Sequence, residues 1–235
     1  MGKRAVALVP AAGRGLRMGS HIPKQFLTLG GLPILVHSLR VLEASDLIAE
    51  IILAVPEAER EFCLREIVTP HRFSKVKKIV AGGAQRQDSV RHGLEAVDAS
   101  AELILVHDAV RPFITQDMIK RVLEAAANHG ASVVAIPVPD TVKQVGADGL
   151  IECTVDRGRL WLAQTPQAFR LPLFLEAHRK AVLDGIQGTD DTQLVERLGH
   201  RVAVVEGSGE NIKITRPEDF IVGEAILAAR GGRET

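Results

Sequence analysis

Short apolar segments alternate along the chain with longer segments in which apolar residues recur at helical spacing. The short segments are apolar at consecutive positions, which is typical of strands that a parallel sheet buries on both faces. The predicted strands are residues 5–9, 51–55, 77–80, 103–106, 132–138 and 202–205. The predicted helices are residues 34–44, 57–68, 89–97, 116–129 and 173–183. This order predicts an α/β fold with a mostly parallel sheet and helices on both faces.

Residues that start and stop helices support this division. Thr115 and Asp117 favour a helix start at residue 116, and Gly130 favours its end. Pro217 suits the first turn of a C-terminal helix that we expect to end near Arg230. No repeat, low-complexity segment or linker rich in serine and glycine interrupts the pattern. We therefore expect the 235 residues to form a single domain.

One region departs from the alternation of strands and helices. Residues 141–145 and 150–155 are predicted to form the two strands of a hairpin, with a turn over residues 146–149. A hairpin inserted in an α/β fold often extends as an arm toward a ligand or partner, and it can equally be a local decoration of the sheet edge. The pattern alone leaves both interpretations open.

Composition narrows the class of protein. Hydrophobic residues make up 46% of the chain and charged residues 25%, which predicts a globular protein with a substantial core. Basic and acidic residues number 29 each, so no overall basic field draws the protein to nucleic acid or anionic lipid. Cys63 and Cys153 fit neither a zinc motif nor a disulfide framework, and no apolar stretch approaches the roughly 18 residues of a membrane span. We expect a cytoplasmic protein with no nucleic-acid or membrane partner.

The first predicted strand leads into a glycine-rich segment, Pro10-Ala11-Ala12-Gly13-Arg14-Gly15-Leu16-Arg17-Met18-Gly19. Open α/β sheets bind phosphates at such a turn, because small residues let backbone N–H groups approach the oxygens. The P-loop ending is absent, and Met18 stands where the dinucleotide motif needs a third glycine. Arg14, Arg17 and Lys24 suit instead a triphosphate that is attacked at its α-phosphorus, the alternative being a solvated basic loop.

Two motifs near the start of the chain resemble the signature of nucleotidyltransferases that activate sugar phosphates. They are Pro10-Ala11-Ala12-Gly13-x-Gly15-x-Arg17-Met18 and Pro23-Lys24-Gln25-Phe26. Further matches follow in order: Gly82-Gly83-x-x-Arg86-x-x-Ser89-Val90, Val106-His107-Asp108-Ala109-x-Arg111-Pro112, Asp140-Thr141, Asp156-Arg157, Gln164-Thr165-Pro166-Gln167 and Asn211-Ile212-Lys213-Ile214-Thr215-x-Pro217-Glu218-Asp219. Together the motifs resemble the 2-C-methyl-D-erythritol 4-phosphate cytidylyltransferase family of the non-mevalonate isoprenoid pathway. Val110 stands where that family usually has alanine.

This resemblance implies a Rossmann-like nucleotidyltransferase fold and transfer of a cytidylyl group from CTP to 2-C-methyl-D-erythritol 4-phosphate. The catalytic residues that it implies are Arg17, Lys24 and Lys213. The nucleotide-binding residues are Pro10, Ala11, Ala12, Gly13, Gly15, Gly82, Gly83, Ala84, Ser89 and Asp108. The acceptor-binding residues are Ala109, Arg111, Thr141, Arg157, Thr165 and Thr189.

The chemistry of such a transfer agrees with the residues present. A phosphate monoester is mostly dianionic at neutral pH, because its second pKa is about 6, so the nucleophile needs no general base. The sequence accordingly has no His-Glu-x-x-His or Gly-x-Ser-x-Gly motif. The barrier lies in bringing two anions together and in stabilising charge on the phosphoryl oxygens, a role for cationic side chains. We expect a Mg²⁺ ion held mainly by the triphosphate, with no metal site built from protein ligands.

Several of these residues also have a purely structural interpretation. Asp108 could cap a turn, His107 could pack in the core, and Thr189 could cap a helix at residues 193–198. Cytidylyl transfer to another polyol phosphate, such as ribitol 5-phosphate, would use the same nucleotide site. A nonenzymatic nucleotide-binding protein is a further alternative, but it would have no reason to keep the whole cluster of cations.

The predicted hairpin also bears on assembly. A lone two-stranded hairpin is marginal in water, and this one carries the apolar residues Val142, Val145, Leu150, Ile151 and Val155. The resemblance places the equivalent of Arg157 on the acceptor phosphate of the partner subunit. We therefore expect a homodimer in which residues 140–160 reach the neighbouring active site. The alternative is a hairpin folded onto its own sheet.

Overall fold

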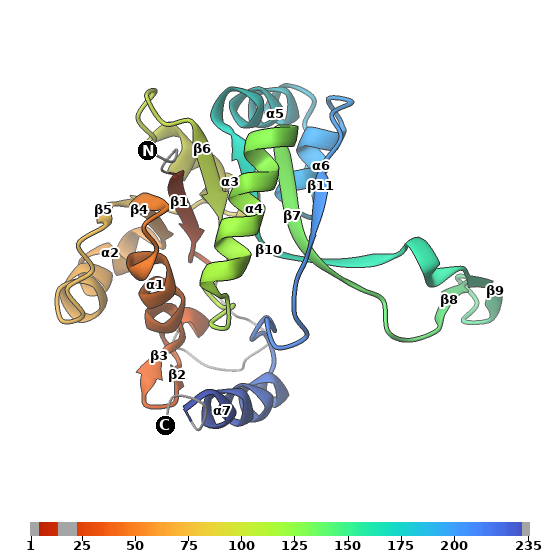
Figure 1. Ribbon diagram of the computed structural model, residues 1–235, viewed down its shortest axis with the longest axis horizontal. Helices are drawn as coiled ribbons and strands as arrows, with labels where there is room; N and C mark the ends of the chain where they lie inside the picture. The colour runs from red at the N-terminus through yellow and green to blue at the C-terminus, as the bar shows by residue number, and fades with distance from the viewer. Residues whose placement is uncertain (1–4, 14–22, 232–235) are drawn as a thin grey trace.

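A seven-stranded sheet forms the centre of the protein, for which a computed structural model describes residues 5–13 and 23–231 (Figure 1). Its strands, in spatial order, are β11 (Ala203–Glu206), β7 (Ala131–Pro137), β10 (Trp161–Arg170), β6 (Leu103–Val106), β1 (Ala5–Pro10), β4 (Ile48–Val55) and β5 (Val76–Ala81). β10 is antiparallel to both of its neighbours, and the other strand pairs are parallel. The prediction of a mostly parallel α/β sheet is therefore confirmed.

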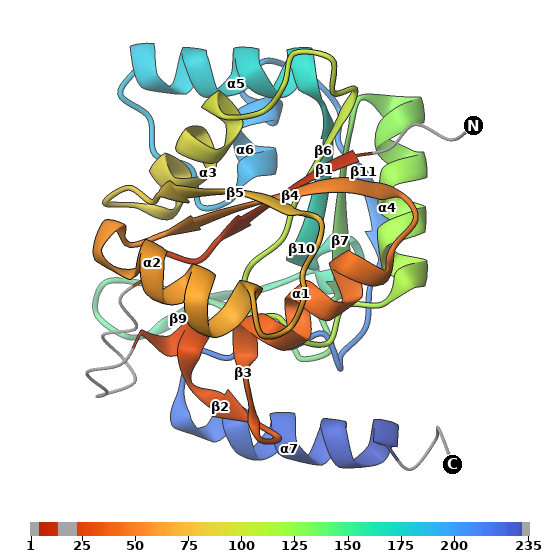
Figure 2. The ribbon, with the colours of Figure 1, turned by 90° about the vertical axis from the view of Figure 1, so that its left-hand side faces the viewer.

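Helices cover both faces of this sheet. They are α1 (Ile34–Ala44), α2 (Arg60–Phe62, continued by π-helical turns over Cys63–Val68), α3 (Arg86–Glu95), α4 (Gln116–His129), α5 (Leu171–Leu183), α6 (Asp191–Glu196) and α7 (Pro217–Gly231). Figure 2 shows α3, α5 and α6 on one side of the sheet and α1 and α2 on the other. The alternation of side chains along β1 explains this: Ala7 and Val9 pack with α1 and α4, whereas Val6 and Leu8 pack with α3 and α5.

The helix boundaries follow the signals in the sequence. α4 begins after Thr115, whose Oγ1 accepts a hydrogen bond from the Met118 N–H at 3.2 Å. It ends at Gly130, whose φ of +91° favours glycine. α7 begins at Pro217 as predicted and packs against a small sheet of β2 (Thr28–Leu29) and β3 (Leu32–Pro33). The C-terminal helix thereby holds the segment around Lys213 close to the body of the fold.

β10 was not among the predicted strands. Its central residues include Gln164, Thr165 and Gln167, which are buried although they are polar, and Pro166 interrupts any strand pattern. Residues 164–166 lie opposite the single residue Val134 of β7, so the pairing is broken there by a bulge. This irregularity frees their polar groups for contacts outside the sheet.

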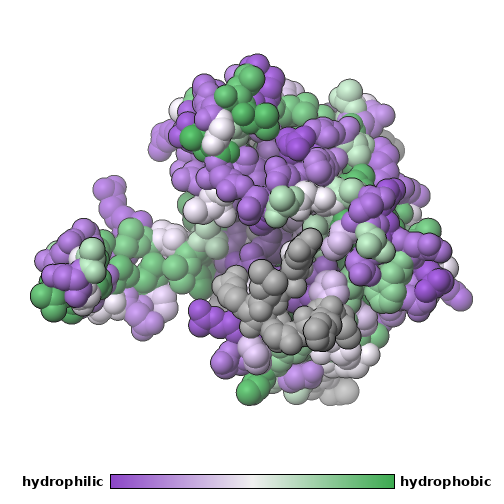
Figure 3. Space-filling model, turned by 180° about the vertical axis from the view of Figure 1, so that it is seen from behind, coloured by the Kyte–Doolittle hydropathy of each residue, from purple (hydrophilic) through white to green (hydrophobic). Residues whose placement is uncertain are grey.

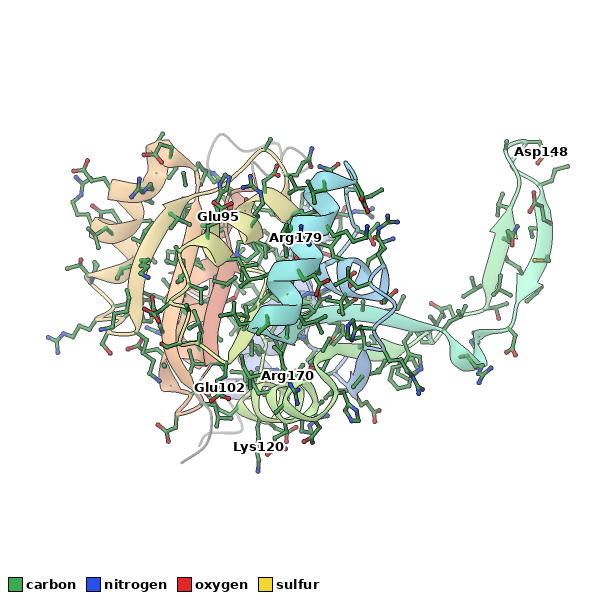
Figure 4. All side chains as sticks on the ribbon, turned by 90° about the horizontal axis from the view of Figure 1, so that it is seen from above. Glu95, Glu102, Lys120, Asp148, Arg170 and Arg179 are labelled. Atoms are coloured by element: carbon green, nitrogen blue, oxygen red, sulfur yellow. The ribbon has the colours of Figure 1, made fainter. Side chains whose placement is uncertain are left out.

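The predicted hairpin is confirmed, and it projects from the body of the protein (Figures 1 and 4). It consists of β8 (Val142–Val145) and β9 (Ile151–Val155), and Asp148 lies at its far end in Figure 4. Figure 3 shows apolar side chains along this arm. Leu150 and Ile151 are 68% and 62% exposed, so the described part of the chain leaves them without apolar cover.

Among the described residues, no helix combines the length and the apolar character that crossing a membrane requires.

Candidate active site

A crevice with a volume of about 990 Å³ opens at the carboxyl edge of the parallel strands. Four of its walls are the segments that follow β1, β4, β5 and β6, where an open α/β sheet changes the direction of its winding. Its lining residues are Pro10, Ala11, Ala12, Gly13, Lys24, Gln25, Pro56, Glu57, Gly82, Gly83, Ala84, Gln85, Arg86, Ser89, Asp108, Ala109, Val110, Lys213 and Thr215. The structure thus brings together most of the predicted nucleotide-binding residues and both predicted catalytic lysines, Lys24 and Lys213.

The segment after β1 is fixed by hydrogen bonds to neighbouring parts of the chain. The Ala11 N–H donates a hydrogen bond to the Ala54 carbonyl at 2.7 Å, and the buried Gln25 amide donates to the Ala11 carbonyl. Gln25 therefore fixes the chain beside Lys24 against the floor of the crevice. The predicted residues Gly15 and Arg17 lie outside the described residues.

Two glycines after β5 are required by close packing. A Cβ atom at Gly82 would lie 2.2 Å from the Ala12 Cβ, and one at Gly83 would lie 2.1 Å from the Asp88 Cβ. The Gly83 N–H donates to Ser89 Oγ at 3.1 Å, and this hydroxyl donates to the Gln85 carbonyl at 3.2 Å. Only glycine at position 82 lets the segment lie this close to the β1 loop, and only glycine at position 83 lets it lie this close to the start of α3.

Asp108, the second residue after β6, is the centre of the charges in the crevice. Its Oδ1 accepts from Arg86 Nε at 2.8 Å, and its Oδ2 lies 2.6 Å from Lys213 Nζ. Burial alone would raise the pKa of Asp108, but Arg86 and Lys213 lower it well below its usual range. The carboxylate is therefore ionised at neutral pH and holds two cations at the edge of the crevice.

His107 and Thr165 support this carboxylate from behind. Thr165 Oγ1 accepts from the Asp108 N–H at 3.0 Å and lies 3.2 Å from His107 Nδ1. His107 Nε2 lies 3.0 Å from the Arg111 carbonyl, which can only accept, so the ring carries its proton on Nε2 and accepts the Thr165 hydroxyl at Nδ1. Burial lowers the pKa of His107 to about 4, and the imidazole is neutral. The expectation that His107 packs in the core is confirmed.

The predicted acceptor-binding residues are more widely spread. Ala109 lines the crevice, and Arg111 lies behind it, where its Nη1 donates to the Asn211 carbonyl at 2.7 Å. Thr141 and Arg157 are exposed at the base of the arm and do not line the crevice, and Arg157 Nη1 donates to the Pro139 carbonyl. Thr189 is also exposed, and its N–H donates to Gln193 Oε1 at 2.8 Å.

The helix after Thr189 differs slightly from the expectation. α6 begins at Asp191 instead of at residue 193, and its N-cap is Asp190, whose Oδ1 accepts from the Gln193 N–H at 3.0 Å. Thr189 precedes this cap. The neighbouring Asp191 faces inward and is 1% exposed.

Some residues of the site were not predicted. Arg86 lines the crevice, and its Nη1 donates to Asp191 Oδ2 at 2.6 Å. Asn211 Nδ2 donates to Gln164 Oε1 at 3.0 Å and to the Thr165 carbonyl at 2.9 Å, which ties the segment before Lys213 to β10. A signal for Asp191 was present, because it lies three and four residues before the apolar residues 194 and 195 and shares their helix face.

Protein ligands for a metal ion are few in this crevice. The described residues contain no group of three or more histidine, cysteine, aspartate or glutamate side chains that could hold a metal ion. Glu57 and Asp108 are the carboxylates among the described lining residues, and both oxygens of Asp108 already contact cations. The donor set fits an ion that arrives with phosphate ligands of its own.

The fold and the site define a Rossmann-like nucleotidyltransferase. The sheet is mostly parallel, glycines line a crevice at its carboxyl edge, and cations face that crevice. The chain belongs to the 2-C-methyl-D-erythritol 4-phosphate cytidylyltransferase (IspD) family, whose profile matches residues 5–229.

Relatives and solved structures agree with this placement. A 2-C-methyl-D-erythritol 4-phosphate cytidylyltransferase from Syntrophus aciditrophicus (strain SB) is 50% identical over 233 residues, covering 99% of this chain and all of the relative. One from Geobacter metallireducens is 50% identical over 224 residues, covering 94% of this chain and 96% of the relative.

The crystal structure of 4-diphosphocytidyl-2C-methyl-D-erythritol synthase from Anaerococcus prevotii superposes with a TM-score of 0.84 at 32% identity, covering 96% of this chain and 99% of that one. The crystal structure of the 2-C-methyl-D-erythritol 4-phosphate cytidylyltransferase from Thermus thermophilus gives 0.79 at 38% identity, with the same shares covered. The family resemblance drawn from the motifs is confirmed.

Proposed function

We propose that the chain transfers the cytidylyl group of CTP to 2-C-methyl-D-erythritol 4-phosphate. The products are 4-(cytidine 5'-diphospho)-2-C-methyl-D-erythritol and pyrophosphate, and the reaction supplies isoprenoid precursors in the cytoplasm. The observation that carries the proposal is that Lys24 and Lys213, which come from opposite ends of the chain, line one crevice. Gly82 and Gly83 form another wall of the same crevice. An acceptor phosphate oxygen attacks the α-phosphorus, and the bond to the β-phosphate breaks as pyrophosphate leaves with its electron pair.

The nucleotide occupies the segments after β1 and β5. Backbone groups of residues 10–13 bind phosphate, and the segment from Gly82 to Ser89 reads the pyrimidine. The N-terminus of α3 adds to the attraction of anions, because Gln85, Arg86 and Ser89 at its start line the crevice. In this proposal the backbone groups of the small residues Gly82, Gly83 and Ala84, which line the crevice, select cytosine over a purine.

Cations supply the stabilisation of the transition state. Lys24 and Lys213 reach the phosphates from two sides, and Arg17 joins them from the segment after Gly13. Charge that develops on the α-phosphoryl oxygens and on pyrophosphate is stabilised by such preorganised donors. No general base takes part, because the acceptor phosphate is already mostly dianionic. His107 is buried, and both of its ring nitrogens are already engaged, by the Arg111 carbonyl and the Thr165 hydroxyl.

A Mg²⁺ ion accompanies the triphosphate in this proposal. The crevice offers few carboxylates, which fits an ion held mainly by phosphate oxygens and water, with Asp108 as the neighbouring protein carboxylate. When bound, the ion neutralises phosphate charge and polarises the P–O bonds. Lys24, Lys213 and the backbone of residues 10–13 orient the phosphates around it.

The protein acts as a single-domain homodimer in this proposal, and residues 140–160 form its dimerisation arm. Support comes from the exposed apolar residues of the arm and from the position of Arg157, which is exposed and apart from the crevice of its own chain. Arg157 and Thr141 then complete the acceptor site of the partner, together with Ala109, which lines the crevice, and with Arg111, Thr165 and Thr189, which lie outside its lining. A second subunit would also cover Leu150 and Ile151.

The deciding experiment measures pyrophosphate release from CTP, UTP and ATP, each with 2-C-methyl-D-erythritol 4-phosphate and with ribitol 5-phosphate. We expect release with CTP and the methylerythritol acceptor. Faster release with ribitol 5-phosphate would make that compound the acceptor instead of 2-C-methyl-D-erythritol 4-phosphate. Equal release with ATP would remove the cytidylyl assignment. Binding of CTP without any release would indicate a nonenzymatic nucleotide-binding protein.

A further inference from the structure

A line of alternating charges runs from behind the active-site crevice to its edge. Arg86 donates from Nη1 to Asp191 Oδ2 at 2.6 Å and from Nε to Asp108 Oδ1 at 2.8 Å. The second oxygen of Asp108 lies 2.6 Å from Lys213 Nζ. One guanidinium therefore joins two carboxylates from distant parts of the chain, and the second carboxylate holds the lysine.

The inner end of this line is buried, and its two cations are more exposed than its two carboxylates. The side chains of Asp191 and Asp108 are 1% and 8% exposed, and those of Arg86 and Lys213 are 28% and 37% exposed. Asp191 is not among the residues that line the crevice, whereas the other three are. It therefore acts on the site through Arg86 and not by contact with a substrate.

Asp191 is ionised in this position. Burial alone would raise its pKa, but Arg86 and His178 lower the pKa below its usual value. A buried carboxylate gains little stability from its ion pair, because desolvation offsets the attraction. Since stability alone does not account for a buried charge here, its geometric effect on Arg86 is the better explanation.

Further contacts tie residues 186–190, the segment that precedes α6, to α3. The Gly188 N–H donates to Gln87 Oε1 at 2.8 Å, and Gln87 Nε2 donates to the Ile186 carbonyl at 3.1 Å. Arg86 and Gln87, neighbours at the start of α3, thus hold both ends of the segment that precedes α6. The nucleotide side of the crevice and this loop are fixed in one relative position.

We propose that Asp191 is a positioning residue, which fixes Arg86 and through it orients Asp108 and Lys213 for attack on the α-phosphorus. The inference rests on the proposed function for the step that it names. Arginine is required at the centre, because its planar fork presents donors to two carboxylates at once, whereas lysine offers a compact single charge.

The test compares steady-state pyrophosphate release by the wild-type protein, D191N, R86K and the double variant. D184N is the matched control, because it removes the charge of an aspartate that pairs with Lys180 and Arg197 at the surface, away from the crevice lining. For D191N we expect kcat to fall at least tenfold while KM for CTP changes less than threefold. The double variant should lose less than the product of the two single losses, because both changes break one linkage. Circular dichroism and thermal unfolding confirm that each variant is folded at the assay temperature.

The outcomes separate the inference from the proposed function. D184N close to wild type, together with a slow D191N that still binds CTP in calorimetry, supports positioning. The inference is overturned by a D191N rate within twofold of D184N, by strictly multiplicative losses, or by loss of CTP binding along with activity. In each of these cases wild-type activity leaves the proposed function intact. Absence of release by the wild-type protein removes the proposed function and, with it, the step that Asp191 is inferred to serve.

Discussion

Lys213 Nζ lies 2.6 Å from Asp108 Oδ2. A lysine from the segment between β11 and α7 thus forms an ion pair with an aspartate that closely follows β6. The lysine is 37% exposed at its side chain and the aspartate 8%. The buried partner fixes one side of the ammonium and leaves the rest facing the crevice. A flexible lysine is thereby held in one place before a substrate arrives, which lowers the entropic cost of using it.

Replacement of Lys213 by alanine should impair both substrates. We expect kcat/KM to fall on the order of 10²–10³-fold, with higher KM for CTP and for the acceptor, because the ammonium stands between their phosphates. Steady-state kinetics with each substrate varied in turn measures this. Lys120→Ala, on the exposed face of α4, is the control and should behave as wild type (Figure 4). If only thermal stability changed in Lys213→Ala, the lysine would be structural.

Lys24→Ala and Arg17→Ala should each slow turnover much more than they weaken CTP binding. Both cations are proposed to stabilise charge that grows in the transition state, and one preorganised donor contributes roughly 3–4 kcal/mol. Single-turnover rates and calorimetric CTP binding separate the two effects. Turnover equal to wild type in either variant would contradict the role of that residue.

Gly82→Ala should weaken both the fold and nucleotide binding. The new Cβ would lie 2.2 Å from the Ala12 Cβ, so the β1 and β5 loops must move apart. Overpacking of this kind costs about 1–3 kcal/mol, and we expect a higher KM for CTP with a smaller preference over ATP. Gly231→Ala is the control, because no heavy atom lies within 4 Å of its added Cβ. Equal CTP and ATP selectivity in Gly82→Ala and wild type would contradict this account of base recognition.

Stability should fall as the pH drops from about 6.5 to 4. Burial lowers the pKa of His107 from 6.5 to about 4, so in this window the unfolded chain takes up a proton that the folded chain does not. The full effect is about 3 kcal/mol of unfolding free energy, present above pH 6.5 and lost as pH falls toward 4. Urea unfolding across this range measures it. His107→Gln cannot bind this proton, and the same slope in that variant and in wild type would contradict the assignment.

Mixing two inactive variants tests whether the arm acts on the partner. If Arg157 serves the neighbouring subunit, heterodimers of Arg17→Ala and Arg157→Ala contain one site with both residues intact and recover activity. The exposed position of Arg157, away from the crevice of its own chain, favours this result. Mass spectrometry of the mixture verifies subunit exchange. No recovery after demonstrated exchange would place Arg157 in the site of its own subunit.

Much of the fold follows from local pattern. The predicted bounds of α1, α4 and β6 agree with the structure, because the two helices show clear helical periodicity and β6 is a run of consecutive apolar residues. β10 was missed, because its buried glutamines satisfy their amides through residues far away in the chain. Gln167 Nε2, for example, donates to Asp190 Oδ2 at 2.8 Å. No local pattern reports such a partner.

The candidate site was predicted where a motif carries its chemistry in adjacent residues. The glycines at 82 and 83 and the cations at 24 and 213 are of this kind, and all line the crevice. Arg86 was part of a motif, but its two carboxylate partners lie 22 and 105 residues further along the chain. Its role as a link between two carboxylates therefore becomes visible only in three dimensions.

Because of the bulge in β10, the number of residues in the arm can change without a change in the register of the sheet. In a continuous strand, insertion or deletion of one residue turns every side chain beyond it to the opposite face. Here pairing with β7 stops at Ala163 and resumes at Gln167, with residues 164–166 outside the ladder. A change in length between residues 138 and 160 consequently leaves the register of residues 167–170 with β6 untouched. Evolution can therefore lengthen, shorten or resurface the arm while the catalytic framework is inherited unchanged.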